Sequence, residues 1–361
     1  MTGRAGAGPA GPEGAVRVSR FTGPRGTTLH LAFATGDPAQ PLPANGGLRV
    51  QAGGPPVPDP RRLTRRLATE MLLKHRLHHT GFWGAKMLVT GADAVDDNLL
   101  AAVARVLNTH AGTLYTGADM GVSTADMERL SRMTPYVLNA IGSSVEPHTA
   151  TAFGVLGAVE AWTRGPVTGL RVLVHGVGKV GGVLAGELVA AGATVLTYDT
   201  DPRVPDIPGS RSVRDWAEQD VDVLVPCSVS DLVDPALAGR LRCGAVIGSA
   251  NAVLAEEDTT AAILRRRGVD YVPTPLVGAG AVIVDSIEHY ARTAFRAASP
   301  DRVYAFVRQT VRTAVRDLLD TAPGPAPSTV LRHARDLTAR PFCGLRFPTT
   351  GAEGDLQGHL A

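Results

Sequence analysis

The chain has 361 residues, and its proportions of 44% hydrophobic and 19% charged residues are typical of a globular protein long enough for two domains. A formal net charge of +2 gives no reason to expect nucleic acid or an anionic membrane as a partner. Its three cysteines, Cys227, Cys243 and Cys343, fit neither a disulfide framework nor a zinc motif. Since no apolar run could span a bilayer and the start is not leader-like, we expect a cytoplasmic protein with reduced thiols and no metal site.

The first part of the chain is expected to form an α/β domain over residues 16–147. It follows a stretch at 1–15, mostly Gly, Ala and Pro, that is expected to be a disordered tail. Periodicity and breaker residues predict a strand at 29–34, a loop at 41–54, a helix at 60–78, a strand at 87–89, a helix at 96–110 and a loop at 115–123. An irregular, glycine-containing segment at 135–148 is predicted to connect this domain to the next.

Residues 171–201 carry the pattern of a nucleotide-binding unit. A short apolar strand leads into three glycines in G-x-G-x-x-G spacing, a helical segment follows, and a second strand ends on an aspartate. The glycines permit a tight turn close to a pyrophosphate, the helix N-terminus supplies N–H donors, and the carboxylate can accept bonds from ribose hydroxyls. The unit therefore predicts nicotinamide dinucleotide binding. The expected contacts within it are Gly176, Gly178, Lys179, Val180, Gly181 and Asp199.

The remaining elements predict the fold around this unit. A helix at 149–163 precedes it, and strands at 221–226, 245–249 and 271–272 alternate with helices after it. This alternation is typical of a doubly wound parallel sheet, so residues 148–298 are predicted to form a Rossmann domain. Helices are predicted at 283–298 and 300–319, and the region 299–361 is expected to pack back on the first domain.

A dinucleotide domain beside a second α/β domain favours hydride transfer in a cleft between them, so the first domain should supply the acid, the base and the substrate anchors. Lys74, Lys86 and Asp119 are the candidates. Two lysines meeting in a closed cleft would lower one another's pKa, so that one could act as a base while the other holds a carboxylate. Lysines on a helix are usually solvated, so spacing alone leaves a surface role open.

A series of motifs resembles the glutamate, leucine, phenylalanine and valine dehydrogenases, nearest to the leucine and phenylalanine branch. The resemblance runs from about Gly46 to Glu288. Its motifs, in order, are GGLR (46–49), MLLK (71–74), GAK (84–86), TGADMG (116–121), GSSVEPHTATAFG (142–154), HGVGKVG (175–181) and SANAVL (249–254). It implies an N-terminal substrate domain, also used for oligomer contacts, and a C-terminal Rossmann domain, with the active site in the cleft between them.

The resemblance also implies a reaction and roles for the three candidates. Lys74 matches the lysine that binds the substrate carboxylate, Lys86 the catalytic lysine that activates water, and Asp119 the aspartate that assists proton transfer. The implied reaction is NAD-dependent, reversible oxidative deamination of an L-amino acid to a 2-oxo acid and ammonium. Further expected substrate contacts are Gly47, Met71, Asn45, Val282 and Asp285, and further cofactor contacts are Thr151, Cys227, Ser228, Ala250 and Asn251.

Two loops depart from the family pattern. Trp83 and Ala85 stand where relatives usually carry glycines, and they would crowd the site unless Trp83 turns into the core. Asn251 is followed by Ala252 where relatives carry paired asparagines, and Gly278–Ala281 lacks the asparagine of the later motif. Part of the shell that orients substrate and nicotinamide is therefore expected to be altered.

Asp285 bears on the substrate. If it faces the side-chain pocket, an aliphatic substrate would leave its carboxylate without a partner, so a polar or cationic side chain would fit better. The alternative is an acid on the exposed face of a helix that also carries Glu288. For the cofactor, Asp199 favours NAD because it would repel a 2′-phosphate, whereas Arg203 nearby keeps NADP open.

These features predict an amino acid dehydrogenase that forms a homo-oligomer and acts on a small amino acid or 2-oxo acid, without nucleic acid or membrane partners. Two alternatives stay open. One is an imine or oxo-acid reductase of a specialised biosynthetic pathway. The other is a catalytically silent NAD-binding protein, which the altered asparagines favour and the retained Lys74, Lys86 and Asp119 oppose.

Overall fold

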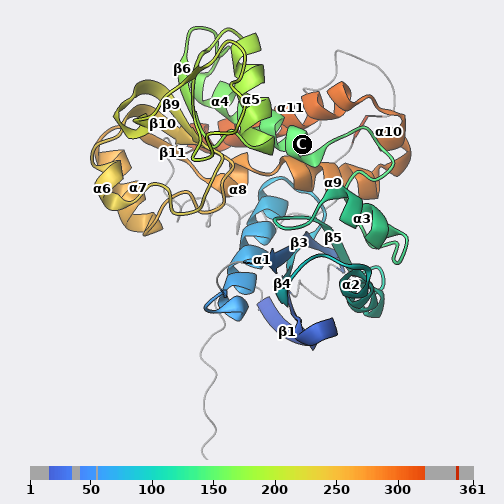
Figure 1. The fold of residues 1–361 in the computed structure, drawn as a ribbon. Helices are drawn as coiled ribbons and strands as arrows, with labels where there is room; N and C mark the ends of the chain where they lie inside the picture. Colours follow the sequence, from blue (N-terminus) through green and yellow to red (C-terminus); the bar gives the residue numbers. More distant parts are fainter. Residues whose placement is uncertain (1–15, 35–40, 54–55, 322–346, 349–361) are drawn as a thin grey trace, which may run out of the picture. The chain divides into compact units, whose positions relative to one another are not determined.

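The computed structural model describes residues 16–34, 41–53, 56–321 and 347–348, which form two compact units (Figure 1). The described part of the first unit lies within residues 16–76 and 81–141. The second comprises Leu77–Thr80, residues 142–321 and residues 347–348. The units divide between Ile141 and Gly142. The tail predicted at 1–15 and most of the chain after Thr321 lie outside the described residues.

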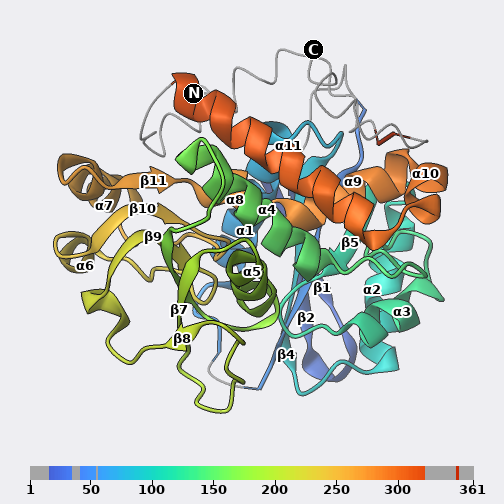
Figure 2. The same ribbon diagram turned by 90° about the horizontal axis from the view of Figure 1, so that it is seen from above.

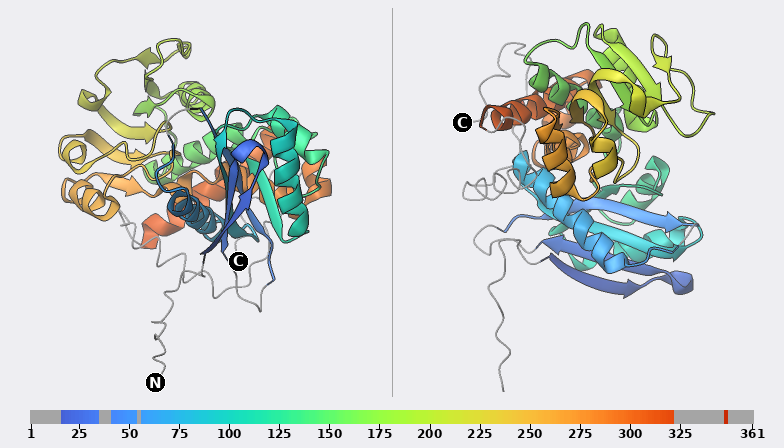
Figure 3. Two further views of the ribbon diagram at one scale, coloured as in Figure 1. Left: turned by 60° about the horizontal axis from the view of Figure 1, so that its bottom comes forward. Right: turned by 90° about the vertical axis from the view of Figure 1, so that its left-hand side faces the viewer.

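The first unit is a five-stranded mixed sheet covered by helices on both faces (Figures 1 and 3). The strand order is β1-β2-β4-β3-β5, antiparallel from β1 to β4 and parallel from β4 through β3 to β5. Helix α1 covers one face, and α2 and α3 cover the other. The strands are β1 (Val16–Thr22), β2 (Thr28–Ala34), β3 (Ala44–Ala52), β4 (Trp83–Ala92) and β5 (Leu114–Ala118), and the helices are α1 (Pro60–Leu77), α2 (Asp97–Thr109) and α3 (Thr124–Ser131).

The predicted loop at 41–54 is wrong, because β3 lies there, between β4 and β5. Asparagine and glycine are depleted in strands, so local propensity favoured a loop. Tertiary packing decides the matter: a Cβ on Gly46 would lie 1.7 Å from the Ala85 carbonyl oxygen, and one on Gly47 would lie 2.8 Å from Asp119 Cβ. The glycines let this strand sit close to its neighbours. Tertiary packing also makes β4 longer than the predicted strand at 87–89.

The second unit contains a six-stranded parallel sheet in the order β11-β10-β9-β6-β7-β8. The order reverses between β6 and β9, as in a Rossmann fold, which confirms the predicted fold class. The strands are β6 (Arg171–His175), β7 (Thr194–Tyr198), β8 (Arg211–Ser212), β9 (Asp220–Pro226), β10 (Arg242–Ile247) and β11 (Asp270–Val272).

Helices bury both faces of the parallel sheet (Figures 1 and 2). Leu173, Leu224 and Val246 point to one face, where they form a core with α6 (Pro235–Ala238) and α7 (Glu257–Arg266). Helices α4 (Pro147–Thr163) and α5 (Lys179–Ala190) lie on the other side of the sheet. The apolar strand runs in the sequence thus correspond to strands that are covered on both faces.

The long helix α11 (Pro300–Thr321) runs along α4 inside the second unit (Figure 2). A Cβ on Gly157 would lie 2.2 Å from the Arg308 carbonyl oxygen, so the two helix backbones are in close contact. Arg308 Nε donates to Glu160 Oε2 at 2.8 Å. The apolar face of α11 was recognisable from sequence, but its partner helix α4 was not. The packing of region 299–361 on the first domain stays a prediction.

Three short helices connect the sheet to α11. They are α8 (Thr274–Val277), α9 (Gly280–Tyr290) and α10 (Arg292–Ala297). Helix α9 is nearly all buried, including Asp285 and Glu288, each only 7% exposed. The interpretation of Asp285 as an acid on an exposed helix face is therefore wrong. Its sequence neighbours did not reveal this, because burial of α9 depends on packing within the second unit.

Candidate functional site

The first unit brings two of the predicted catalytic side chains into direct contact. Lys86, on β4, is buried with only 5% of its side chain exposed, and its Nζ lies 2.6 Å from Oδ2 of Asp119, which directly follows β5. Gly47 of the intervening β3 lies beneath the pair. A Cβ at this position would be 3.1 Å from Lys86 Nζ and 2.8 Å from Asp119 Cβ. The glycine thus leaves room for the lysine and the carboxylate to meet.

Asp119 is held by backbone and side-chain bonds. Its N–H donates to the Leu48 carbonyl at 3.1 Å, and Arg49 Nε donates to its Oδ2 at 2.8 Å. Burial raises the pKa of the Asp119 carboxyl. The charges of Lys86 and Arg49, and their hydrogen bonds, outweigh this effect and hold the pKa well below its usual range. Asp119 is therefore an anion in this arrangement.

Lys74, on α1, lies within electrostatic reach of the same pair. Desolvation lowers the pKa of the Lys74 ammonium, Glu70 and Asp119 raise it, and Lys86 lowers it. Lys86 thus lowers the pKa of Lys74, although desolvation is the larger cause. The structure groups Lys74, Lys86 and Asp119 in the first unit, together with a fourth charged residue, Arg49, to which the sequence prediction gave no role.

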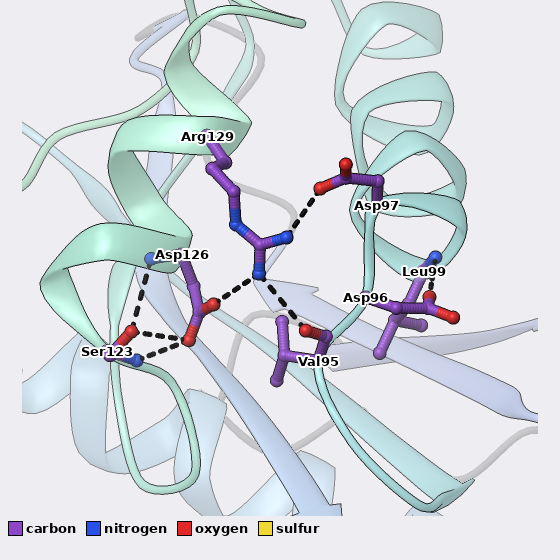
Figure 4. Close-up of polar contacts among 7 residues, drawn as sticks. All are labelled: Val95, Asp96, Asp97, Leu99, Ser123, Asp126 and Arg129. Carbon is purple, nitrogen blue, oxygen red and sulfur yellow. Dashed lines mark hydrogen bonds and ion pairs between the residues drawn. The ribbon is translucent and has the colours of Figure 1, made fainter.

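The chain after Asp119 is fixed by a polar cluster at the start of α3 (Figure 4). Ser123 and Asp126 form a capping box, and Arg129 Nη2 binds Asp126 Oδ1 at 2.6 Å. The Arg129 guanidinium also donates to Asp97, in the first turn of α2, and to the Val95 carbonyl oxygen at 3.1 Å. These bonds fix the segment that follows Asp119 in the sequence to helices α2 and α3.

The other predicted substrate contacts of the first unit lie on β3 and α1. Asn45 shares the face of β3 with Gly47, because side chains alternate along a strand, and its carbonyl oxygen lies 3.1 Å from His75 Nε2. Met71 is half-buried on α1. Trp83 is 8% exposed and belongs to the core of this unit, with the Arg76 guanidinium 5.1 Å from its ring centroid. Of the two readings of Trp83, the core reading is thus the right one.

In the second unit, two glycines of the nucleotide motif, Gly176 and Gly181, are required by close neighbours. Gly176 has a φ of +92°, and a Cβ there would lie 2.6 Å from Ser228 Cβ. A Cβ on Gly181 would lie 1.9 Å from the Gly176 carbonyl oxygen. Gly178 faces open space and directly precedes α5, whose first residues, Lys179 and Val180, leave their N–H groups at the turn. This cradle fits a pyrophosphate.

Asp199 directly follows β7 and is fixed toward the glycine turn. The Val177 N–H donates to its Oδ2 at 2.7 Å, and the Asp201 N–H donates to its Oδ1 at 3.0 Å. Arg203 is engaged by Asp201, with Nη2 and Oδ2 2.8 Å apart. The acid is thus placed at the carboxyl end of the strand beside the motif, where a ribose would bind.

The remaining cofactor candidates follow β9 and β10 at the same edge of the sheet, apart from Thr151, which lies on α4 and donates to the Pro147 carbonyl at 3.0 Å. Burial raises the pKa of the Cys227 thiol, and Ser249 Oγ donates to Cys227 Sγ at 3.4 Å, which suits packing better than nucleophilic attack. Ser228 lies shortly after β9, and Ala250 and Asn251 lie shortly after β10.

A cluster around the buried His175 at this edge was missed. His175 Nδ1 lies 2.6 Å from Ser228 Oγ, and the His175 ring is 4.9 Å from that of Tyr198 and 4.5 Å from that of Trp216. Burial lowers the pKa of His175. The pairing of His175 with Tyr198 across parallel strands could have been anticipated from the two strand ends, but the approach of Trp216 could not.

Comparison with known proteins also points to amino acid dehydrogenases. A sequence profile described as Glutamate/Leucine/Phenylalanine/Valine dehydrogenase matches residues 199–334. The chain is 29% identical over 246 residues to phenylalanine dehydrogenase of Caldalkalibacillus thermarum, a match that covers 62% of this chain and 66% of that protein. It is 27% identical over 277 residues to leucine dehydrogenase of Geobacillus stearothermophilus, covering 71% and 74%. The matches thus span 66% and 74% of the length of these relatives.

Solved structures of amino acid dehydrogenases share the fold. L-tryptophan dehydrogenase from Nostoc punctiforme matches with a TM-score of 0.69 and 21% identity over 91% of this chain and 96% of its own. The hetero-hexameric glutamate dehydrogenase from Thermus thermophilus matches with a TM-score of 0.70 and 21% identity, over 90% and 88%. No helix among the described residues is long and apolar enough to cross a membrane. From its sequence relatives and its fold, the chain is a member of the glutamate, leucine, phenylalanine and valine dehydrogenase family, on the side of the leucine and phenylalanine dehydrogenases.

Proposed function

We propose that this protein catalyses the reversible, NAD-dependent oxidative deamination of an L-amino acid to a 2-oxo acid and ammonium. The observation that carries the proposal is the contact of Lys86 with Asp119 above Gly47, with Lys74 within electrostatic reach. A carboxylate anchor, a base and an acid partner are the groups that this reaction requires. The glycine cradle and Asp199 of the second unit complement them with a fitting place for the cofactor.

In this proposal each residue has a defined task. The Lys74 ammonium binds the substrate carboxylate and so fixes the α-carbon. When bound, NAD+ accepts the hydride from that carbon. Lys86, as the neutral amine, removes a proton from the water that attacks the resulting iminium, and Asp119 holds the Lys86 side chain in place and stabilises the ammonium that forms. Collapse of the carbinolamine then releases ammonium and the 2-oxo acid.

The choice of NAD over NADP is supported by the surroundings of Asp199. Its carboxylate is fixed by the Val177 and Asp201 N–H groups, so its negative charge stays where a 2′-phosphate would be placed. Arg203, the cation that could receive such a phosphate, is already paired with Asp201. Both features favour a free 2′-hydroxyl.

The substrate is proposed to carry a polar or cationic side chain rather than a purely aliphatic one. The resemblance implies that Asn45 and Asp285 occupy positions that are apolar in the leucine branch, and both residues are buried. Polar residues at both positions make the proposed pocket more polar, which suits a substrate side chain that carries polar groups. Gly47, Met71 and Val282 complete the proposed substrate contacts. The proposed enzyme is a homo-oligomer, as the resemblance implies.

The test is a spectrophotometric assay of the full-length protein with NAD+ and a panel of L-amino acids, and in reverse with NADH, ammonium and the matching 2-oxo acids. NADH formation with at least one amino acid, absent with its D-enantiomer, is expected. If no amino or oxo acid is turned over while NADH binds, the protein is a silent NAD-binding protein and the proposal fails. Turnover of oxo acids or imines without ammonium would instead identify a reductase.

A further inference from the structure

Arg49 is the charged neighbour of the Lys86–Asp119 pair, and the tasks proposed above do not include it. It lies two residues after Gly47 on β3, so its side chain leaves the strand on the same face. Only 14% of that side chain is exposed. A guanidinium buried to this extent needs a negatively charged partner, and the Asp119 carboxylate provides one.

The geometry at Asp119 shows a carboxylate held from two sides. Arg49 Nε donates to Oδ2 at 2.8 Å, and Arg49 Nη2 lies 3.5 Å from Oδ1. Lys86 Nζ binds the same Oδ2 at 2.6 Å, from β4. One carboxylate oxygen is thus shared by two cations from adjacent strands, and the other faces the end of the guanidinium.

The backbone keeps Arg49 and Asp119 together. The Asp119 N–H donates to the Leu48 carbonyl, and the Val50 N–H donates to the Met120 carbonyl, both at 3.1 Å. These bonds flank Arg49 and hold the turn after β5 against β3. A Cβ on Gly121 would lie 2.0 Å from the Val50 carbonyl oxygen, so the turn could not sit so close with a larger residue. The contact between Arg49 and Asp119 is therefore built into the sheet.

We propose that Arg49 is a positioning residue for the deamination reaction: it fixes the rotamer of the Asp119 carboxylate and thereby the place of the Lys86 amino group. This inference rests on the proposed function. Arg49 itself touches neither substrate nor cofactor in this role and acts through Asp119. Without it, Asp119 keeps one cation and can rotate, and Lys86 moves with it. A displacement of about 1 Å is enough to lower a rate by on the order of 100-fold.

The charges around Asp119 support the same role. The groups that face it are Arg49 on β3, Lys86 on β4 and, at longer range, Lys74 on α1, while Glu70 acts on Lys74. Burial raises the pKa of Asp119, and Lys86 and Arg49 lower it further than burial raises it. Removing Arg49 deletes one of the two cations, so Asp119 should take up a proton at a higher pH.

The kinetic test compares Arg49→Gln and Arg49→Lys with the wild type across pH. Arg49→Gln should lower kcat by about 10- to 100-fold with little change in the amino acid KM, and should add an acidic limb to the pH profile of kcat. Arg49→Lys keeps the charge but not the planar guanidinium with its several N–H donors, so its kcat should be intermediate. The matched control is Arg25→Gln, which removes an exposed arginine paired with Asp96 at 3.3 Å in the same unit and should behave as wild type. Wild-type kcat and pH profile in Arg49→Gln would refute the proposal.

A second arm does not require activity. In protein labelled with 13C at aspartate side chains, the Asp119 carboxyl resonance is assigned by its loss in Asp119→Asn. It should stay ionised to the lowest pH at which the wild type is folded, and should titrate at higher pH in folded Arg49→Gln or Arg49→Lys. An unchanged titration in both variants would overturn the proposal. If the wild type turns over no amino acid but this titration shifts, the proposed function fails while the role of Arg49 at Asp119 stands.

Discussion

Lysine is scarce in this chain, and its positions are informative. Of 36 lysine and arginine residues only three are lysines, Lys74, Lys86 and Lys179. All three lie in the proposed substrate and cofactor sites, whereas the cations that serve ion pairs elsewhere, such as Arg308 with Glu160, are arginines. An arginine binds carboxylates well but does not give up its proton in proteins. A lysine at position 86 is thus what a proton-transfer role demands.

Lys86→Arg separates charge from proton transfer. The guanidinium can still pair with Asp119, but it cannot act as a base, so kcat should fall by on the order of 10²- to 10⁴-fold. NADH affinity, measured by calorimetric titration, should stay close to that of the wild type. The reverse exchange Arg25→Lys, at an exposed ion pair of the same unit, serves as the control. Unchanged turnover in Lys86→Arg would show that Lys86 supplies only charge.

Ala252 is a strained residue at the edge of the parallel sheet. Its φ is +45°, a left-handed conformation that costs an alanine about 1 kcal/mol and that asparagine adopts more readily. Ala252→Asn, which restores the asparagine pair of the resemblance, should raise the free energy of unfolding by roughly 0.5–1 kcal/mol. Denaturant titration measures this. A lower stability in Ala252→Asn would argue against the left-handed conformation.

At the scale of elements, the sequence predicted what local patterns encode. The strand, glycine turn, helix and strand from β6 to β7 follow from spacing within about 30 residues, because Gly176 and Gly181 are required by neighbours in the same motif or one strand away. Strand β3 was missed, since the reasons for Gly46 and Gly47 lie at Ala85 and Asp119, far along the chain. With β3 taken as a loop, the alternation that puts Arg49 on the face of Gly47 was lost as well.

The pairing of α4 with α11 can be tested with two glycines in helices. Gly157 lies on α4 where a Cβ would be 2.2 Å from the Arg308 carbonyl oxygen, whereas Gly186 on α5 has nothing within 4 Å of such a Cβ. Gly186→Ala should raise the free energy of unfolding by about 0.5–1 kcal/mol, since alanine is the better helix former. Gly157→Ala should lower it by about 1–3 kcal/mol through overpacking. Equal effects of both substitutions would contradict the close packing of these helices.

At the scale of the whole molecule, the residues of the proposed reaction belong to two separately built units. The mixed sheet of the first carries the buried charges of Lys86, Asp119 and Arg49, and the parallel sheet of the second carries the glycine turn and Asp199. The fold class and the part of the proposed site that would bind the cofactor were predictable from sequence motifs. Burial of Asp285 was not, because it depends on how α9 packs within the second unit. The central claim is that both units serve one hydride transfer.

The most direct test of that claim traces deuterium from the α-carbon of the substrate to the nicotinamide ring. The protein is incubated with NAD+ and the best substrate of the amino acid panel, deuterated at its α-carbon, and the NADH, 2-oxo acid and ammonium are quantified by mass spectrometry and enzymatic assay. Deuterium on the nicotinamide ring, with oxo acid and ammonium formed in equal amounts, and loss of all three products in Lys86→Arg, is the predicted result. NADH without deuterium, or ammonium formed without NADH, would contradict the account.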